Sequence, residues 1–70
     1  MVYFKKIEKA LHYIIYHEKD FPWSRVIEII FATKNMRKKG NKIEIETENH
    51  YILCSLEGDT LWVINAKHKK

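Results

Sequence analysis

Four histidines are the side chains in this sequence that titrate near neutral pH without help from their surroundings. They are His12, His17, His50 and His68. His12 and His17 are five residues apart, a spacing that points them away from a common helix face, unlike the i, i+4 pair of a helical metal site. No cysteine and histidine group has zinc spacing, so no metal is expected. Each histidine is predicted to be a surface residue, with proton transfer as the functional alternative.

Positive charge is concentrated in two stretches of the chain. The formal net charge is +4 at pH 7, and cations gather between Lys34 and Lys42 and again at the end of the printed sequence. Such clusters favour binding to polyanions such as RNA or DNA. The predicted nucleic-acid-binding residues are Lys34, Arg37, Lys38, Lys39, Lys42, Lys67 and His68. The alternative interpretation is a solvated loop and a frayed tail, kept soluble by their lysines.

Most catalytic chemistries are excluded by the residue types present. Gly40 and Gly58 are the only glycines, so no glycine-rich loop can cradle a phosphate, and no cofactor is expected. The single cysteine, Cys54, rules out an internal disulfide and is predicted to be a small buried hydrophobe. What remains is phosphate-directed chemistry, in which cations hold a backbone, a histidine or glutamate moves a proton and an aromatic ring stacks on a base. Residues of these types are Arg37, Lys39, Lys42, Glu46, His50, Trp62, Lys67 and His68.

The stretch from Lys42 to Lys67 predicts a three-stranded antiparallel meander. Its segments and two-residue turns are 42–48, Asn49-His50, 51–57, Gly58-Asp59 and 60–67. Turns of this length fix the register, and in that register both hairpins place the same apolar residues on one face. The inward set is Ile43, Ile45, Thr47, Ile52, Cys54, Leu56, Leu61 and Val63.

Two amphipathic helices are predicted before the meander. The first runs from about Val2 to Glu18, and the second from about Pro22 to Thr33, since proline is tolerated in the first turn of a helix. The apolar residues of the first helix recur at helical spacing, at Phe4, Ile7, Leu11 and Ile14. A strand is the alternative for the β-branched part of the second helix. Residues 34–41 are expected to form a basic loop that ends in a turn at Gly40-Asn41.

The predicted architecture is therefore an α+β domain over residues 1–70, in which two N-terminal helices pack on one face of a three-stranded antiparallel meander in the order α-α-β-β-β. The opposite face of that sheet is too apolar to be covered by water alone. Its apolar residues, which form the predicted interface, are Tyr51, Leu53, Trp62 and Ile64. This patch predicts burial against a partner, most simply a second copy in a homodimer. A strongly twisted sheet, with the first helix wrapped onto the patch, is the alternative.

No apolar run approaches the roughly 20 residues that a membrane span needs, and the N-terminus lacks the features of a signal peptide. A cytoplasmic protein without a membrane partner is therefore expected. The abundance of lysine, glutamate and isoleucine is typical of a thermophile, and an AT-rich genome gives the same composition.

The order of features resembles the small RelE/BrnT-like toxin class and the related DUF4258 family of uncharacterised domains. The segments that carry the resemblance are HYIIYHE, FPWSRVIEII, NMRKKGNKIEIE and YILCSLEGDTLWVINAKHKK. The resemblance implies an RNA-cleaving toxin fold directed at the ribosome or at mRNA, with an antitoxin-like protein as partner, and it implies RNA contact for Lys67 and His68. The chain departs from the family in having no predicted strand before its first helix and no arginine-rich surface.

Two functions follow as predictions. The first is a small basic RNA-associated protein with a toxin-like fold and a weak or lapsed ribonuclease activity. The second is a non-catalytic interaction module that forms a homodimer through the outer face of the sheet.

Overall fold

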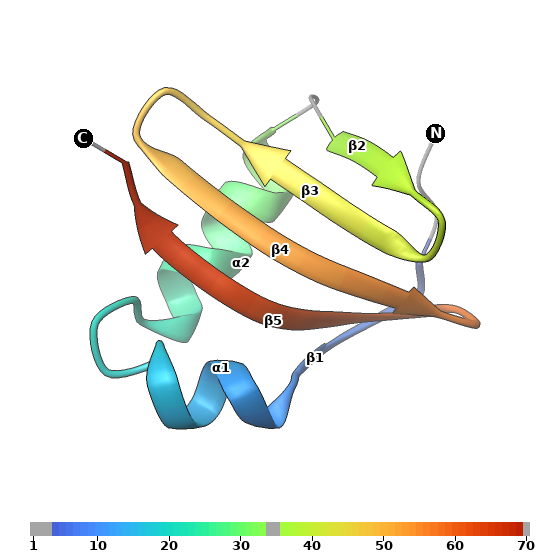
Figure 1. The fold of residues 1–70 in the computed structure, drawn as a ribbon, viewed down its shortest axis with the longest axis horizontal. Helices are drawn as coiled ribbons and strands as arrows, with labels where there is room; N and C mark the ends of the chain where they lie inside the picture. Colours follow the sequence, from blue (N-terminus) through green and yellow to red (C-terminus); the bar gives the residue numbers. More distant parts are fainter. Residues whose placement is uncertain (1–3, 34–35, 70) are drawn as a thin grey trace.

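The structure is a computed structural model that describes residues 4–33 and 36–69. Its element order is β-α-α-β-β-β-β, with the helices early in the chain and most strands late (Figure 1). The elements are β1 (Lys6–Lys9), α1 (Leu11–Tyr16), α2 (Trp23–Ala32), β2 (Met36–Lys39), β3 (Lys42–Glu46), β4 (His50–Glu57) and β5 (Thr60–His68). None of the helices in these residues is long and apolar enough to cross a membrane.

The strands form one five-stranded mixed sheet in the order β1-β5-β4-β3-β2. β1 runs parallel to β5, and the other neighbouring pairs are antiparallel. The class is α+β, but the predicted three-stranded antiparallel meander in the order α-α-β-β-β is wrong, because one strand is added at each edge. We call the side of the sheet that faces away from α2 the outer face; Figure 1 looks onto it, with α2 behind the sheet.

The first edge strand replaces part of the predicted N-terminal helix. Ile7 pairs with Leu61, and the backbone N–H of Ala10 donates to the carbonyl of Val63 at 2.9 Å. This pairing satisfies backbone groups of β5 that would otherwise form an open sheet edge. The helix that follows has only six residues. The helical spacing of apolar residues from Phe4 onward therefore did not indicate a long helix.

The second edge strand is the segment predicted to be a basic loop. Met36 pairs with Ile45, and Lys39 pairs with Lys42. Gly40 turns the chain with a φ of 63°, a left-handed conformation that glycine adopts without steric cost. Because β2 and β3 form a tight hairpin, the cations of this segment occupy fixed positions on a strand.

One hairpin register was predicted correctly and the other was not. Leu56 pairs with Leu61 across the Gly58 turn, as expected. In the first hairpin Ile45 pairs with Ile52, although the predicted partner of Ile52 was Thr47. The cause is a longer loop, in which the backbone N–H of Thr47 donates to the carbonyl of His50 at 2.9 Å. The register moves by an even number of residues, so the inward and outward faces are preserved.

A bulge in β5 changes the side of the sheet to which the residues after Ile64 point. Cys54 pairs with Val63 but Leu53 pairs with Asn65, so Ile64 has no opposed residue. As a result Ala66, which simple alternation places on the outer face, is 2% exposed and belongs to the core. The bulge also sets the side on which the last residues of the strand project.

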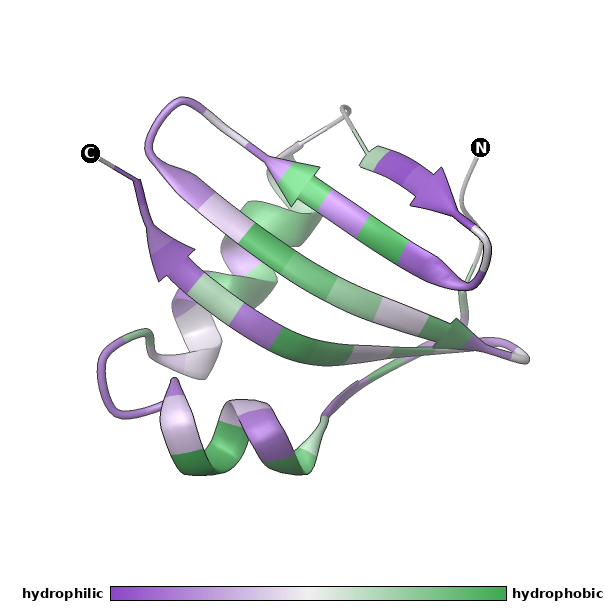
Figure 2. Ribbon diagram, in the orientation of Figure 1, coloured by the Kyte–Doolittle hydropathy of each residue, from purple (hydrophilic) through white to green (hydrophobic). Residues whose placement is uncertain are grey.

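The core lies between α2 and the inward face of the sheet. Val26, Ile29 and Ile30 of α2 are buried, which confirms the predicted second helix over a strand. The buried inward side chains of the sheet are Ile43, Ile45, Ile52, Cys54, Leu61, Val63 and Ala66. The predicted inward residues Thr47 and Leu56 are only half-buried. In Figure 2 β3 alternates between hydrophobic and hydrophilic residues, as expected of a strand with one covered face.

The short helix α1 packs against β5 but does not bury the predicted apolar stripe. Tyr13 is its buried residue, whereas Leu11 is 70% exposed and Ile14 is 45% exposed. On α2, Phe31 is 67% exposed, whereas Ile29 is buried.

Candidate functional site

The predicted cations lie along the hairpin of β2 and β3 and at the end of β5. Lys42 pairs with Ser55, and His50 pairs with His68. Ser55 and His50 are five residues apart on β4, so at about 3.3 Å per residue the two pairs lie roughly 16 Å apart. Lys42 and the Gly40 turn therefore lie far from the end of β5, whereas Arg37 contacts Glu46, to which Lys69 also bonds. Lys34 lies outside the described residues.

In the hairpin group, carboxylates of β3 neutralise part of the positive charge. A guanidinium nitrogen of Arg37 lies 2.8 Å from Glu46 and 3.5 Å from Glu44, and Nζ of Lys39 lies 3.8 Å from Glu44. Lys38 and Lys42 are exposed and form no ion pair with the described residues. Arg37, Lys39 and Lys42 share the outer face, whereas Lys38 pairs with the inward Ile43 and projects to the other side.

At the end of β5, a lysine and a tyrosine of neighbouring strands come together. Lys67 pairs with Tyr51, and Nζ of Lys67 lies 5.5 Å from the centroid of the Tyr51 ring. The Tyr51 hydroxyl donates to Glu44 at 3.1 Å. Burial, and then the hydrogen bond to Glu44, raise the pKa of Tyr51. The Tyr51 ring is therefore anchored through its hydroxyl beside Glu44, with Lys67 next to the ring.

The chain that follows β5 is fixed beside this pair. The backbone N–H of Lys69 donates to the carbonyl of Asn49 at 2.8 Å, and its Nζ lies 2.8 Å from Glu46 and 3.2 Å from the carbonyl of Thr47. The hydrogen bond from Lys69 is the largest of the effects that lower the pKa of Glu46. The expected frayed tail is thus bonded to the β3–β4 loop as far as residue 69.

Two surface hollows adjoin at this corner of the sheet. One, of about 340 Å³, is lined by Glu46, Tyr51, Lys67 and Lys69. The other, of about 310 Å³, is lined by Arg37, Glu46, Thr47 and Lys69. We call the group Arg37, Glu46, Tyr51, Lys67 and Lys69 the outer-face site. It combines an aromatic ring, three cations and one carboxylate, which is the composition expected for contact with a polyanion that carries flat rings.

The apolar residues predicted as an interface lie on the same face but are less exposed than expected. Leu53, Trp62 and Ile64 are half-buried among their neighbours on the sheet. Next to them, Oδ1 of Asn65 is buried and has no hydrogen-bond partner among the described residues. The homodimer stays a prediction.

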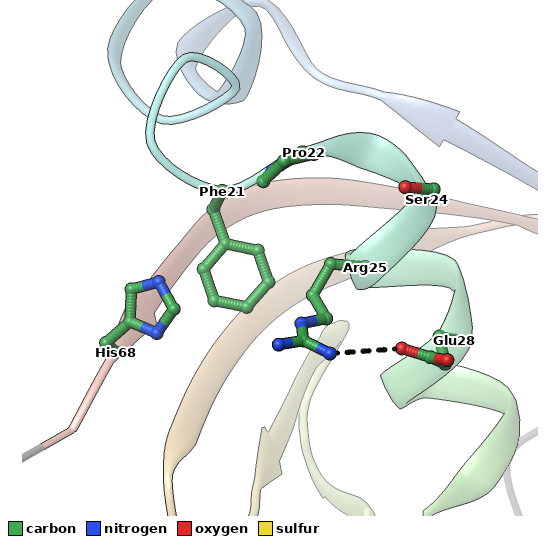
Figure 3. Close-up of a pocket in the computed structure, with 6 residues that line it drawn as sticks. All are labelled: Phe21, Pro22, Ser24, Arg25, Glu28 and His68. Atoms are coloured by element: carbon green, nitrogen blue, oxygen red, sulfur yellow. Dashed lines mark hydrogen bonds and ion pairs between the residues drawn. The ribbon is translucent and has the colours of Figure 1, made fainter.

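A second cluster lies at the same end of the sheet, on the side of the helices. His50 and His68 pair across β4 and β5 with ring centroids 5.4 Å apart, and the Phe21 ring lies 5.5 Å from the first and 4.8 Å from the second. A pocket of about 410 Å³ opens beside them (Figure 3). Its lining residues are Phe21, Pro22, Ser24, Arg25, Glu28 and His68.

The electrostatics of this cluster keep His50 neutral at lower pH than usual. Burial is the largest cause that lowers the pKa of His50, followed by the charges of His68 and Arg25. The guanidinium of Arg25 lies 3.3 Å from Glu28 at the mouth of the pocket (Figure 3). The cluster therefore combines two imidazoles that can accept a proton from a bound molecule or donate one to it, and a cation that can bind an anion.

The roles of Phe21, which precedes α2, and of Arg25, in the first turn of α2, were not predicted because both residues are far from the strands in sequence. The pairing of His50 with His68 was also missed, because His50 was assigned to a turn. The two-residue turn at Gly58 alone would place His50 opposite Lys67; the bulge at Ile64 shifts the pairing by one residue and brings His68 opposite His50.

His12 and His17 do meet, contrary to the prediction from their spacing. Their Nε2 atoms lie 3.3 Å apart, because α1 ends at Tyr16 and the chain turns before His17. Among the described residues, no group of three or more histidine, cysteine or acidic side chains is arranged to hold a metal ion.

Comparison of the chain with protein-family models, with curated proteins and with solved structures found no match. The resemblance to the RelE/BrnT-like class and the DUF4258 family therefore stays a prediction.

Proposed function

We propose that the protein binds single-stranded RNA on the outer face of its sheet, at the outer-face site. The observation that carries the proposal is the position of Lys67, whose Nζ lies 5.5 Å from the ring centroid of Tyr51. The Tyr51 ring, anchored through its hydroxyl, offers a base a surface on which to stack when the Lys67 ammonium group moves from the ring to the phosphate of the same nucleotide.

The charges around Tyr51 support the proposal. Arg37, Lys67 and Lys69 lie around Glu46 in the outer-face site, and Glu44, next to Arg37 and Tyr51, adds a second carboxylate, so three cations face two acids. The Glu46 side chain is 40% exposed, so its ion pairs are weak surface pairs and a phosphate can displace the carboxylate. Lys39 and Lys42, on either side of the Gly40 turn, extend the positive charge along the same face.

A salt titration tests the proposal. Fluorescence anisotropy of a labelled single-stranded RNA measures the affinity at increasing salt concentration. If Lys39, Lys42, Lys67 and Lys69 each contact a phosphate, log affinity should fall with log salt with a slope of about −3. A duplex of the same sequence should bind more weakly, because its bases are not free to stack. No measurable binding at low salt would contradict the proposal.

Matched variants locate the binding. Lys67→Glu should abolish most of the binding, whereas Lys19→Glu makes the same charge change in the exposed turn after α1 and should have a small effect. Tyr51→Ala should cost about 1–3 kcal/mol for the loss of one stacked base. Equal effects of the two lysine variants would mean that net charge, and not the outer-face site, controls the affinity.

Cleavage of RNA is a second candidate function, favoured by the pairing of His50 with His68 beside Arg25. One neutral imidazole would accept the proton of the 2′-hydroxyl as this oxygen attacks the phosphorus. The other, protonated, would donate to the leaving 5′-oxygen, which leaves a cyclic phosphate and a free hydroxyl. The expected activity cleaves RNA but not DNA, persists in a chelator and is lost in His50→Gln and in His68→Gln. Intact RNA after prolonged incubation with the wild-type protein would rule it out.

The homodimer competes with RNA for the same face. Leu53 and Trp62 favour it, because they are half-buried apolar residues whose exposed part a partner chain could cover. Size-exclusion chromatography with light scattering distinguishes the two uses: a dimer that becomes a monomer in Trp62→Glu supports the interface, and a wild-type monomer excludes it.

A further inference from the structure

His12, in the first turn of α1, and His17, which follows the helix, approach each other in a geometry that a hydrogen bond alone does not require. Nε2 of His12 and Nε2 of His17 lie 3.3 Å apart, and the ring centroids are 5.1 Å apart with the planes inclined by 47°. At this nitrogen separation two rings aimed straight at each other would have more distant centroids, so each ring is tilted away from the line between the nitrogens. Two imidazole ligands of one tetrahedral metal ion, at metal–nitrogen distances of about 2.0–2.1 Å, have their nitrogens about 3.3–3.4 Å apart.

We propose that His12 and His17 chelate one divalent transition-metal ion, of the zinc or copper class, through their Nε2 atoms. The chain supplies two imidazoles, and water completes the coordination shell. Imidazole is a ligand that these borderline ions prefer, whereas calcium and magnesium select oxygen ligands. The site is independent of the outer-face site.

The backbone fixes His17 for this role. Its N–H donates to the carbonyl of Tyr13 at 2.9 Å, and its own carbonyl accepts from Asp20 at 3.1 Å and from Phe21 at 2.8 Å. The His12 ring is held by contact with the Tyr16 ring, with centroids 4.9 Å apart. Because both rings are positioned by bonds and contacts of the free protein, little conformational entropy is lost when the ion binds.

The charges near the pair are compatible with a bound cation. Burial lowers the pKa of His17, followed by the proximity of His12, so the ring is neutral, as a metal ligand must be, at a lower pH than usual. Among the charged groups that act on His17, Asp20 favours a cation and Lys67 opposes it. Asp20 has the larger of these two effects, so the fixed charges nearby do not repel a cation.

Isothermal titration calorimetry with zinc chloride, copper chloride and magnesium chloride tests the proposal on the full chain. One zinc ion per chain is expected, with tighter binding of copper, no heat from magnesium, and weaker binding as the pH falls below the pKa of the imidazoles. A magnesium affinity equal to that of zinc, or no zinc binding at neutral pH, would overturn the proposal.

Single variants decide which histidines bind the ion. His12→Ala and His17→Ala should each weaken zinc binding by at least about 10- to 100-fold, because loss of a ligand costs no less than loss of its outer support. His68→Gln removes a ring of the other histidine pair and should leave the affinity unchanged. Binding that survives both alanine variants, or that is lost in His68→Gln, would overturn the proposal. Circular dichroism checks that each variant is folded, and the ring-proton NMR signals of His12 and His17 should shift first during the titration.

Discussion

The hydroxyl of Tyr13 donates a hydrogen bond to the backbone carbonyl of Phe21, and this bond ties α1 to the start of α2. Tyr13 is fully buried, and its ring lies 5.6 Å from that of Trp23. Burial, and then the charge of Glu18, raise the pKa of Tyr13 to about 12. The phenol is therefore neutral and acts as a donor throughout the physiological range.

The Tyr13→Phe variant should lower the free energy of unfolding by about 1–3 kcal/mol, because it leaves the carbonyl of Phe21 without its donor while keeping the buried ring. Urea denaturation measures the change. Tyr16→Phe is the matched control: Tyr16 is 64% exposed, so the same substitution should change stability by less than about 0.5 kcal/mol. Similar losses in both variants would show that the hydrogen bond of Tyr13 does not hold the helices.

Shortening an exposed side chain of α1 should have little effect on stability. Leu11 is 70% exposed, so Leu11→Ala is expected to cost less than about 0.5 kcal/mol. Ile43→Ala in the core should cost about 2–5 kcal/mol, because it removes buried methyl groups and leaves a cavity. Thermal and urea unfolding of the two variants test this difference. A large loss in Leu11→Ala would instead support the long N-terminal helix predicted from the sequence.

The buried thiol of Cys54 predicts a loss of stability at alkaline pH. Burial raises its pKa from 9.0 to about 12. Below pH 9 the thiol is protonated in both states, but above pH 9 the unfolded chain releases a proton that the folded chain keeps. The free energy of unfolding should therefore fall by about 1.4 kcal/mol per pH unit from this group.

Urea unfolding of wild type and Cys54→Ala at several pH values between 9 and 10 isolates the thiol, because Tyr13 contributes with the same sign only above about pH 10. The difference in the free energy of unfolding between the two proteins should shrink as the pH rises from 9 to 10, because the unfolded wild-type chain loses the thiol proton that the folded protein keeps. Parallel curves would mean that the thiol ionises equally in the folded and unfolded chains.

The turn between β4 and β5 depends on the left-handed backbone of Gly58, whose φ is 65°. A Cβ at this position would meet no atom within 4 Å, so any cost of substitution comes from the backbone conformation and not from a clash. Gly58→Ala should lower the free energy of unfolding by about 1–2 kcal/mol. Gly58→Asn should cost less, because asparagine tolerates this conformation, and equal losses would argue against the strain.

Local patterns predicted the parts of the fold that depend on neighbours in sequence. The hairpin across Gly58 and the helix after Pro22 were correct, since turn chemistry and periodicity specify them directly. The first hairpin had the wrong loop length, yet its buried face was right because the register error was even.

Features that depend on distant partners were not predictable in the same way. β1 exists because β5 offers an unpaired edge, and no local signal in residues 6–9 identifies that partner. The bulge at Ile64 likewise depends on the pairing of two strands. The contact between Lys67 and Tyr51 required the bulge in β5, and the contact of His50 and His68 with Phe21 required the position of the segment that leads into α2.

NMR chemical-shift mapping with a single-stranded RNA oligonucleotide at low salt is the most direct test of RNA binding on the outer face. Shift changes are predicted to concentrate at Arg37, Tyr51, Lys67 and Lys69, with the residues of α2 little affected. Changes confined to the pocket beside Phe21 and His68, or no change at saturating RNA, would contradict the proposal.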